Sequence, residues 1–80
     1  MDINETRSLV AEYVNEGSGI ESEELLYRMY IINSFDDEAN RHILEGLCAG
    51  HHIAKFVFVL DKGVKTYYFP KGTRLREAEP

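Results

Sequence analysis

Residues 52–70 read HIAKFVFVLDKGVKTYYFP, and this stretch decides the fold. Its two apolar arms, His52–Leu60 and Val64–Pro70, are rich in the aromatic and β-branched residues that favour strands. Asp61-Lys62-Gly63 between them is a turn sequence, so the stretch predicts a β-hairpin. A two-residue turn at Lys62-Gly63 would place Leu60 opposite Lys65, whereas a three-residue turn at 61–63 would shift the register. The sequence leaves both registers open.

Alternation along the two arms divides their side chains between two faces. In the register with the two-residue turn, four aromatic residues share one face, which we expect to pack on the rest of the domain: Phe56, Phe58, Tyr67 and Phe69. The other face then carries Val57, Val59, Thr66 and Tyr68. Tyr68 is the aromatic residue expected to be exposed.

Three helical segments precede the hairpin. The first is expected from about Asp2 to Glu16, with Asp2 and Glu5 at the spacing of a capping box, and Gly17-Ser18-Gly19 ends it. The second is expected to begin with Ser22 as its N-cap. Its apolar stripe consists of Leu25, Leu26, Met29 and Tyr30, closed by Ile31 or Ile32.

A third helix follows Asn33-Ser34, with either Ser34 or Asp36 as its cap. Its expected buried face consists of Phe35, Ala39, Ile43 and Leu47, and its outer face of Asp37, Glu38, Arg41 and Glu45. Gly50 is the expected C-terminal cap. The order of elements is therefore helix, helix, helix, hairpin.

The composition predicts one small soluble domain. The chain has 80 residues, 44% of them hydrophobic and 29% charged, which is an ordinary globular composition. We expect the domain to span residues 1–72 and residues 73–80 to form a charged, flexible tail. One cysteine fits a reducing compartment, and the acidic N-terminus does not resemble a signal peptide. The longest apolar run, Phe56–Leu60, is too short to span a bilayer, so we expect a cytoplasmic protein without membrane contact.

Charge is divided unevenly along the chain. Residues 1–40 contain ten acidic residues against Arg7 and Arg28, a net charge of −8. Residues 41–80 contain seven basic residues against four acidic ones, a net charge of +3. Such asymmetry suggests an anionic partner for the second half. An acidic body that keeps the protein soluble, with lysines guarding the edge of the hairpin, explains the same pattern equally well.

From Ile20 onward the chain resembles winged helix-turn-helix domains. The resemblance covers roughly residues 3–72. It is carried by Ile20-Glu21-Ser22-Glu23-Glu24-Leu25, by Ile43-Leu44 with Leu47, by Gly50 with Ile53, and by the turn and the return strand of the hairpin. It implies an α+β fold of three helices with a C-terminal two-stranded wing. A short third strand near Gly19-Ile20 would pair with this wing.

The resemblance also implies a small transcriptional regulator that binds duplex DNA and could act as a homodimer. Asn40 and Arg41 on the third helix would read bases, and Lys62 and Lys65 would lie at the wing. The basic residues expected to hold phosphates are Lys62, Lys65, Lys71, Arg74 and Arg76. Asp37, Glu38 and Glu45 surround Arg41 on the same face, and carboxylates weaken phosphate binding.

That acidity supports a second hypothesis, a protein-interaction module on the same fold. Its interface would use Asp37, Glu38, Glu45 and Tyr68 to bind or inhibit a basic protein partner. A third hypothesis is that the aromatic hairpin, with Lys55, Lys62 and Lys65, stacks single-stranded bases.

No pattern in the sequence indicates catalysis. Cys48, His51 and His52, with His42 before them, are the candidate metal ligands, but their spacing differs from that of a structural zinc site. Gly17-Ser18-Gly19 lacks the lysine of a phosphate-binding loop. We therefore expect no enzymatic activity, no metal and no cofactor.

Overall fold

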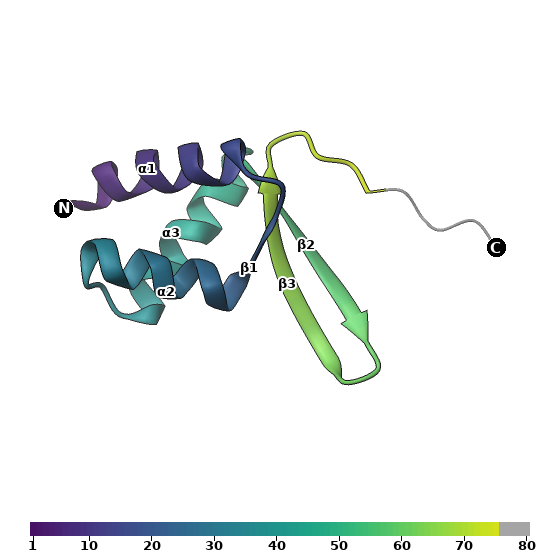
Figure 1. Ribbon diagram of the computed structural model, residues 1–80. Helices are drawn as coiled ribbons and strands as arrows, with labels where there is room; N and C mark the ends of the chain where they lie inside the picture. Colours follow the sequence, from purple (N-terminus) through teal and green to yellow (C-terminus); the bar gives the residue numbers. More distant parts are fainter. Residues whose placement is uncertain (76–80) are drawn as a thin grey trace.

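The computed structural model describes residues 1–75 and contains three helices and a three-stranded antiparallel sheet (Figure 1). The order of three helices and a hairpin matches the predicted order, and the short third strand expected near Gly19-Ile20 lies between the first two helices. The elements are α1 (Ile3–Glu16), β1 (Ile20–Glu21), α2 (Ser22–Asn33), α3 (Asp37–Ala49), β2 (Ile53–Leu60) and β3 (Gly63–Pro70). The helices pack together as one body, and the hairpin of β2 and β3 projects away from it.

Side-chain caps start two of the helices. Asp2 Oδ1 accepts a hydrogen bond from Glu5 N at 2.8 Å, and Asp36 Oδ1 accepts one from Ala39 N at 2.9 Å, so Asp36 rather than Ser34 caps α3. The prediction that Ser22 caps α2 is wrong. Ser22 is the first helical residue and is buried, because the preceding residue, Glu21, is still paired in the sheet.

The sheet has the order β1-β3-β2, so β3 pairs with a strand on each side. Ile20 of β1 lies opposite Tyr68, which confirms the expected third strand. Leu60 lies opposite Gly63, so the turn residues are Asp61 and Lys62, and neither predicted register is correct. Gly63 follows the turn at a φ of +135°, a conformation that glycine adopts without strain. The pairing differs from the two-residue prediction by two positions, an even shift that keeps every side chain on its predicted face.

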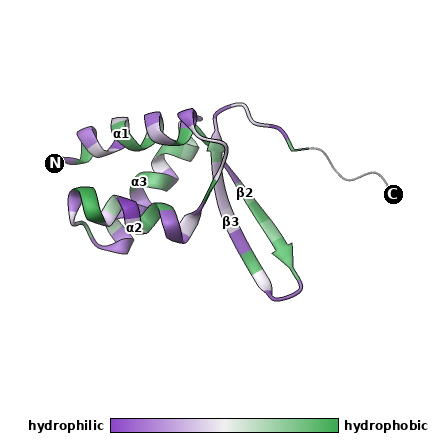
Figure 2. Cartoon of the chain, viewed as in Figure 1, coloured by the Kyte–Doolittle hydropathy of each residue, from purple (hydrophilic) through white to green (hydrophobic). Residues whose placement is uncertain are grey.

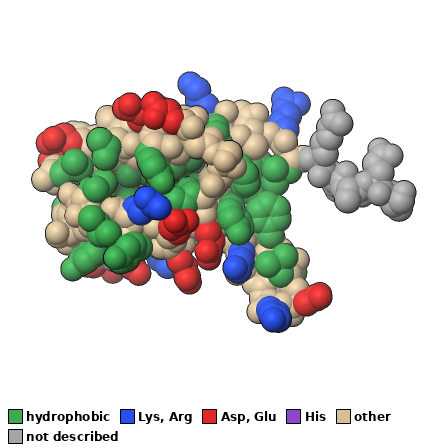
Figure 3. Space-filling model, in the orientation of Figure 1, with side chains coloured by type: hydrophobic (Ala, Val, Ile, Leu, Met, Phe, Trp, Pro, Cys, Tyr) green, Lys and Arg blue, Asp and Glu red, His purple; other side chains and the backbone are tan. Residues whose placement is uncertain are grey.

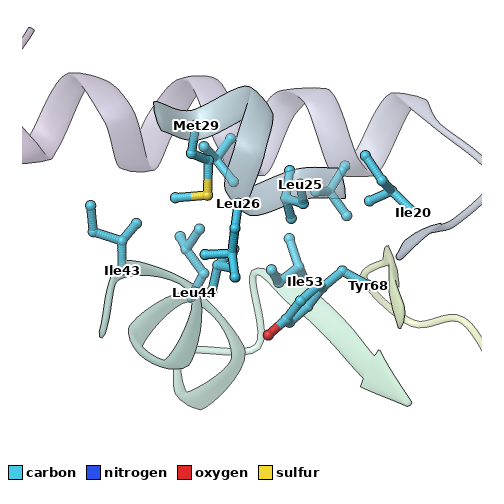
Figure 4. Close-up of a cluster of buried hydrophobic side chains, with 11 residues drawn as sticks. Ile20, Leu25, Leu26, Met29, Ile43, Leu44, Ile53 and Tyr68 are labelled. Atoms are coloured by element: carbon cyan, nitrogen blue, oxygen red, sulfur yellow. The ribbon is translucent and has the colours of Figure 1, made fainter. Parts of the chain in front are cut away.

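The core lies between the helices and one face of the sheet. Figure 4 shows Leu25, Leu26 and Met29 of α2 pointing toward α3, Ile53 and the ring of Tyr68. The full cluster is Val10, Val14, Ile20, Leu25, Leu26, Met29, Ile43, Leu44, Leu47, Ile53 and Tyr68. The predicted burial of Ile43 and Leu47 is confirmed. Phe35 and Ala39 are only half-buried.

The hairpin packs on the helices through the face opposite to the predicted one. Tyr68 and Ile53 are 6% and 3% exposed, whereas the four aromatic residues of the other face are only half-buried. The cause is β1: Ile20 leads into α2 and is buried, and its cross-strand partner Tyr68 points to the same side. Figure 2 shows that β2 is hydrophobic along most of its length, so alternation alone could not distinguish its faces.

The apolar stripe of α2 is also narrower than predicted. Leu25, Leu26 and Met29 are buried, but Tyr30, Ile31 and Ile32 are exposed. Within residues 1–75, no helix has the length and apolar character that crossing a membrane requires.

Candidate nucleic-acid interface

The outer face of α3 carries more acid than base. Arg41 is exposed there, and so are Asp37, Glu38 and Glu45, so the helix has a net charge of −2 from its Asp, Glu and Arg residues. The Nδ1 atom of His42 lies 3.8 Å from a carboxylate oxygen of Glu45. Phosphate binding gains its free energy from neutralising charge, so this face offers a single suitable side chain, Arg41.

Asn40 does not belong to that face, and its predicted role in reading bases is wrong. The side chain is fully buried at the start of α3, where Asn33 Nδ2 donates to Asn40 Oδ1 at 2.8 Å. Asn40 Nδ2 donates to the carbonyl oxygen of Phe35 at 3.3 Å and to Asn33 Oδ1 at 3.4 Å. The amide therefore links the end of α2 to the connecting segment and α3. Its buried polar atoms are satisfied within the protein and do not face a ligand.

Tyr68 is likewise unable to form the predicted protein interface, because it is part of the core. Burial raises the pKa of its hydroxyl, and the nearby Cys48 thiol acts in the same direction. The three acidic residues of the same hypothesis, Asp37, Glu38 and Glu45, do remain exposed.

The predicted basic residues of the hairpin are accessible. Lys62 lies in the turn and Lys65 in β3, and both are exposed, as are Lys71 and Arg74 beyond the strand. Arg76 lies outside the described residues. Between residues 53 and 75 the chain has five basic residues against Asp61, a net charge of +4. Figure 3 shows basic side chains on the projecting hairpin and acidic ones concentrated on the helical body.

An aromatic cluster covers the outer face of the same hairpin. The rings of Phe56 and Phe69 meet edge to face with centroids 5.5 Å apart, and those of Phe58 and Tyr67 do the same at 5.5 Å. The four residues share one face, as predicted, but this face points away from the helices. Lys65 lies on it as well, opposite Phe58.

Asn15 positions the base of the hairpin, a role that the sequence analysis missed. Its Nδ2 donates to the carbonyl oxygen of His52 at 2.9 Å, just before β2. Its Oδ1 accepts from Lys71 N at 2.7 Å, just after β3. One side chain of α1 therefore holds both ends of the hairpin. A polar residue next to Val14 and four positions after Ala11 carries no signal for such a long-range contact.

The candidate metal ligands are not brought together. Cys48 is half-buried, and burial raises the pKa of its thiol, whereas His42, His51 and His52 are exposed. In the part of the chain that the structure describes, no group of three or more His, Cys, Asp or Glu side chains could hold a metal ion.

Comparison with known protein families, with curated proteins and with solved structures gives no match for this chain.

Proposed function

We propose that the chain is a winged-helix DNA-binding regulator that holds the phosphate backbone of duplex DNA mainly through its hairpin. The observation that carries the proposal is the separation of charge. The hairpin and the segment after it have a net charge of +4 up to residue 75, on a domain whose first forty residues have a net charge of −8. Such a domain turns its basic end toward a polyanion during approach.

The geometry of the hairpin supports this mode of binding. It projects from the helical body, so Lys62 and Lys65 can reach a duplex without bringing α1 and α2 close to it (Figure 1). Lys71 and Arg74 follow β3 at the opposite end of the hairpin from its turn. Four flexible side chains along one side of a duplex are sufficient for contacts with the backbone, which fix position but carry little sequence information.

In this proposal α3 contributes less than in a typical winged helix. Arg41 is the exposed arginine of α3, and the carboxylates of Asp37, Glu38 and Glu45 repel neighbouring phosphates. We therefore expect binding to depend on charge and shape more than on base sequence, with a Kd on the order of 10⁻⁴ to 10⁻⁶ M at physiological salt.

The test is fluorescence anisotropy of a labelled random duplex over a range of salt concentrations. Four phosphate contacts give a slope of about −4 for log K against log salt. The double variant Lys62→Gln/Lys65→Gln should reduce that slope to about −2, since two contacts are lost.

A matched variant separates local contacts from net charge. Asn4→Asp/Ser8→Asp lowers the net charge by two, as the lysine variant does, but at exposed positions on α1. It should bind nearly as the wild type does at moderate salt. Equal affinities for the wild type and the lysine variant would refute the proposal, and so would an equal loss in both double variants.

A further inference from the structure

A groove between α1 and α2 lies on the helical body, away from the hairpin. The two helices run side by side in opposite directions (Figure 1), and the space between them has a volume of about 350 Å³. Its apolar lining consists of Leu9, Val10, Tyr13, Leu25, Met29 and Ile32. Leu9, Tyr13 and Ile32 are between 40% and 45% exposed, so the groove presents apolar surface to solvent.

The apolar surface continues around α2. From Leu25 to Ile32, Arg28 is the one charged residue, and Tyr27, Tyr30 and Ile31 are each more than half exposed. A helix that is hydrophobic on nearly all sides is normally buried. Contiguous apolar patches of this kind mark interaction sites on soluble proteins.

Acidic residues border the groove. Glu12 and Glu16 of α1 line it, and within residues 1–75 neither forms an ion pair. Arg28 lines the opposite side, but its guanidinium lies 3.1 Å from a carboxylate oxygen of Glu24 and 5.9 Å from the centre of the Tyr13 ring. The charge of Arg28 is therefore balanced locally by Glu24, and the remaining charged residues of the lining, Glu12 and Glu16, give the groove a net negative border.

We propose that this groove binds an amphipathic helix of a partner protein, with an apolar stripe flanked by Lys and Arg. A helix lying in a groove inserts apolar anchors at positions i, i+3, i+4 and i+7, which suits an apolar channel between two helices. Basic residues beside the stripe would meet Glu12 and Glu16. This proposal does not depend on DNA binding, because it uses no residue of the hairpin.

The charge of the groove argues against a second copy of the chain as its occupant. A twofold interface would place the same patch against itself, so it would bring two patches of net negative charge together. Like charges across an interface disfavour the pairing.

The test is selection from a displayed library of 18-residue amphipathic helices. The apolar positions vary among Leu, Ile, Met and Phe, and the flanking positions among Lys, Gln and Glu. We expect the selected sequences to carry Lys beside the stripe. Enrichment of Glu or Gln there, or no enrichment at all, would overturn the proposal.

Variants then locate the site. The Leu9→Ser/Ile32→Ser protein should bind selected peptides at least about tenfold more weakly, as loss of interface anchors does, while Val59→Ser on the hairpin leaves binding unchanged. Val59 is 83% exposed and serves as the matched apolar position. Glu12→Lys/Glu16→Lys should reduce binding of the Lys-flanked peptides and increase binding of Glu-flanked versions. Unchanged binding by either double variant would place the site elsewhere.

Sedimentation equilibrium of the wild type tests whether a second copy of the chain occupies the groove instead. A monomer is expected at concentrations where the peptide binds. A dimer that Leu9→Ser/Ile32→Ser dissociates would mean that a second copy occupies the groove, and the proposed partner would be wrong.

Discussion

Replacing Asn40 by alanine should destabilise the protein without removing a DNA contact. The substitution removes the 2.8 Å hydrogen bond from Asn33 and the two longer ones that Asn40 donates at 3.3 and 3.4 Å. A buried hydrogen bond contributes about 1 kcal/mol, and we assign about half of that to each longer one, so the free energy of unfolding should fall by about 2 kcal/mol. For a domain of this size, that lowers Tm by roughly 8–16 °C.

Urea denaturation followed by circular dichroism measures this change directly. Asn4→Ala is the control, because Asn4 is exposed on α1, and its free energy of unfolding should change by less than about 0.5 kcal/mol. Asn40→Asp keeps an acceptor for Asn33 but cannot donate to the carbonyl of Phe35 while ionised. It should therefore also destabilise the protein, most strongly at neutral pH, where a buried carboxylate would be charged.

The same variant distinguishes a structural role from base reading. At a temperature where Asn40→Ala remains folded, its affinity for duplex DNA should equal that of the wild type. A variant with unchanged stability and lost DNA affinity would refute the structural role and restore Asn40 as a reading residue.

Three further changes test the packing. Thr6 is fully buried, and its hydroxyl has no hydrogen-bond partner within residues 1–75, so Thr6→Val should raise the free energy of unfolding by about 1 kcal/mol in urea denaturation. Gly19 has a φ of +116°, and a Cβ there would lie 2.6 Å from the ring of Phe69, so Gly19→Ala should lower Tm, whereas Gly17→Ala, with its nearest atoms at 3.6 Å, should not. The raised pKa of Tyr68 means that its contribution to stability is complete below about pH 10 and is lost as pH rises through the folded-state pKa. The free energy of unfolding of Tyr68→Phe should therefore fall less steeply with pH in that range than that of the wild type. An equal pH dependence in both proteins would contradict the raised pKa of Tyr68.

Local patterns predicted the elements of this fold well. Helix starts at Asp2 and Asp36, the break at residues 17–19 and the hairpin turn are each determined by residues close together in sequence. These signals located the elements, but they did not determine the register of the hairpin, where Leu60 lies opposite Gly63, or the N-cap of α2. The order of three helices and a hairpin follows from them, whereas the short strand at Ile20 was expected from the family resemblance and forms through a long-range pairing with β3.

The orientation of the hairpin could not be predicted in the same way. Both of its faces are apolar or aromatic, so period-two alternation does not determine which face is buried. The choice depends on Ile20, more than forty residues away in sequence, which pairs with Tyr68 and turns that side chain into the core. This one contact reverses the expected exposure of Tyr68.

Asn40 was different, because the sequence did contain a usable signal. Asn40, Ile43, Leu44 and Leu47 are spaced as i, i+3, i+4 and i+7, so the residue lies on the buried stripe of α3. Asn40 also comes seven positions after Asn33, which ends α2. A polar residue placed in this way can form hydrogen bonds with the polar groups of the segment between the two helices. The expected reading role came from family resemblance, and the periodicity of α3 was the better guide.

The acidic helical body gives one physical reason for both proposals. In the proposed DNA complex, its carboxylates would keep α1, α2 and most of α3 away from phosphates and limit contact with the duplex to the hairpin, which carries the basic residues. On both proposals, the same charge would leave the groove between α1 and α2 free in the DNA complex and would favour basic over acidic helices as partners. Because the two proposed surfaces share no residue, a variant in one should leave binding at the other intact. The acidity that weakens phosphate binding by α3 would then be a source of selectivity for the groove.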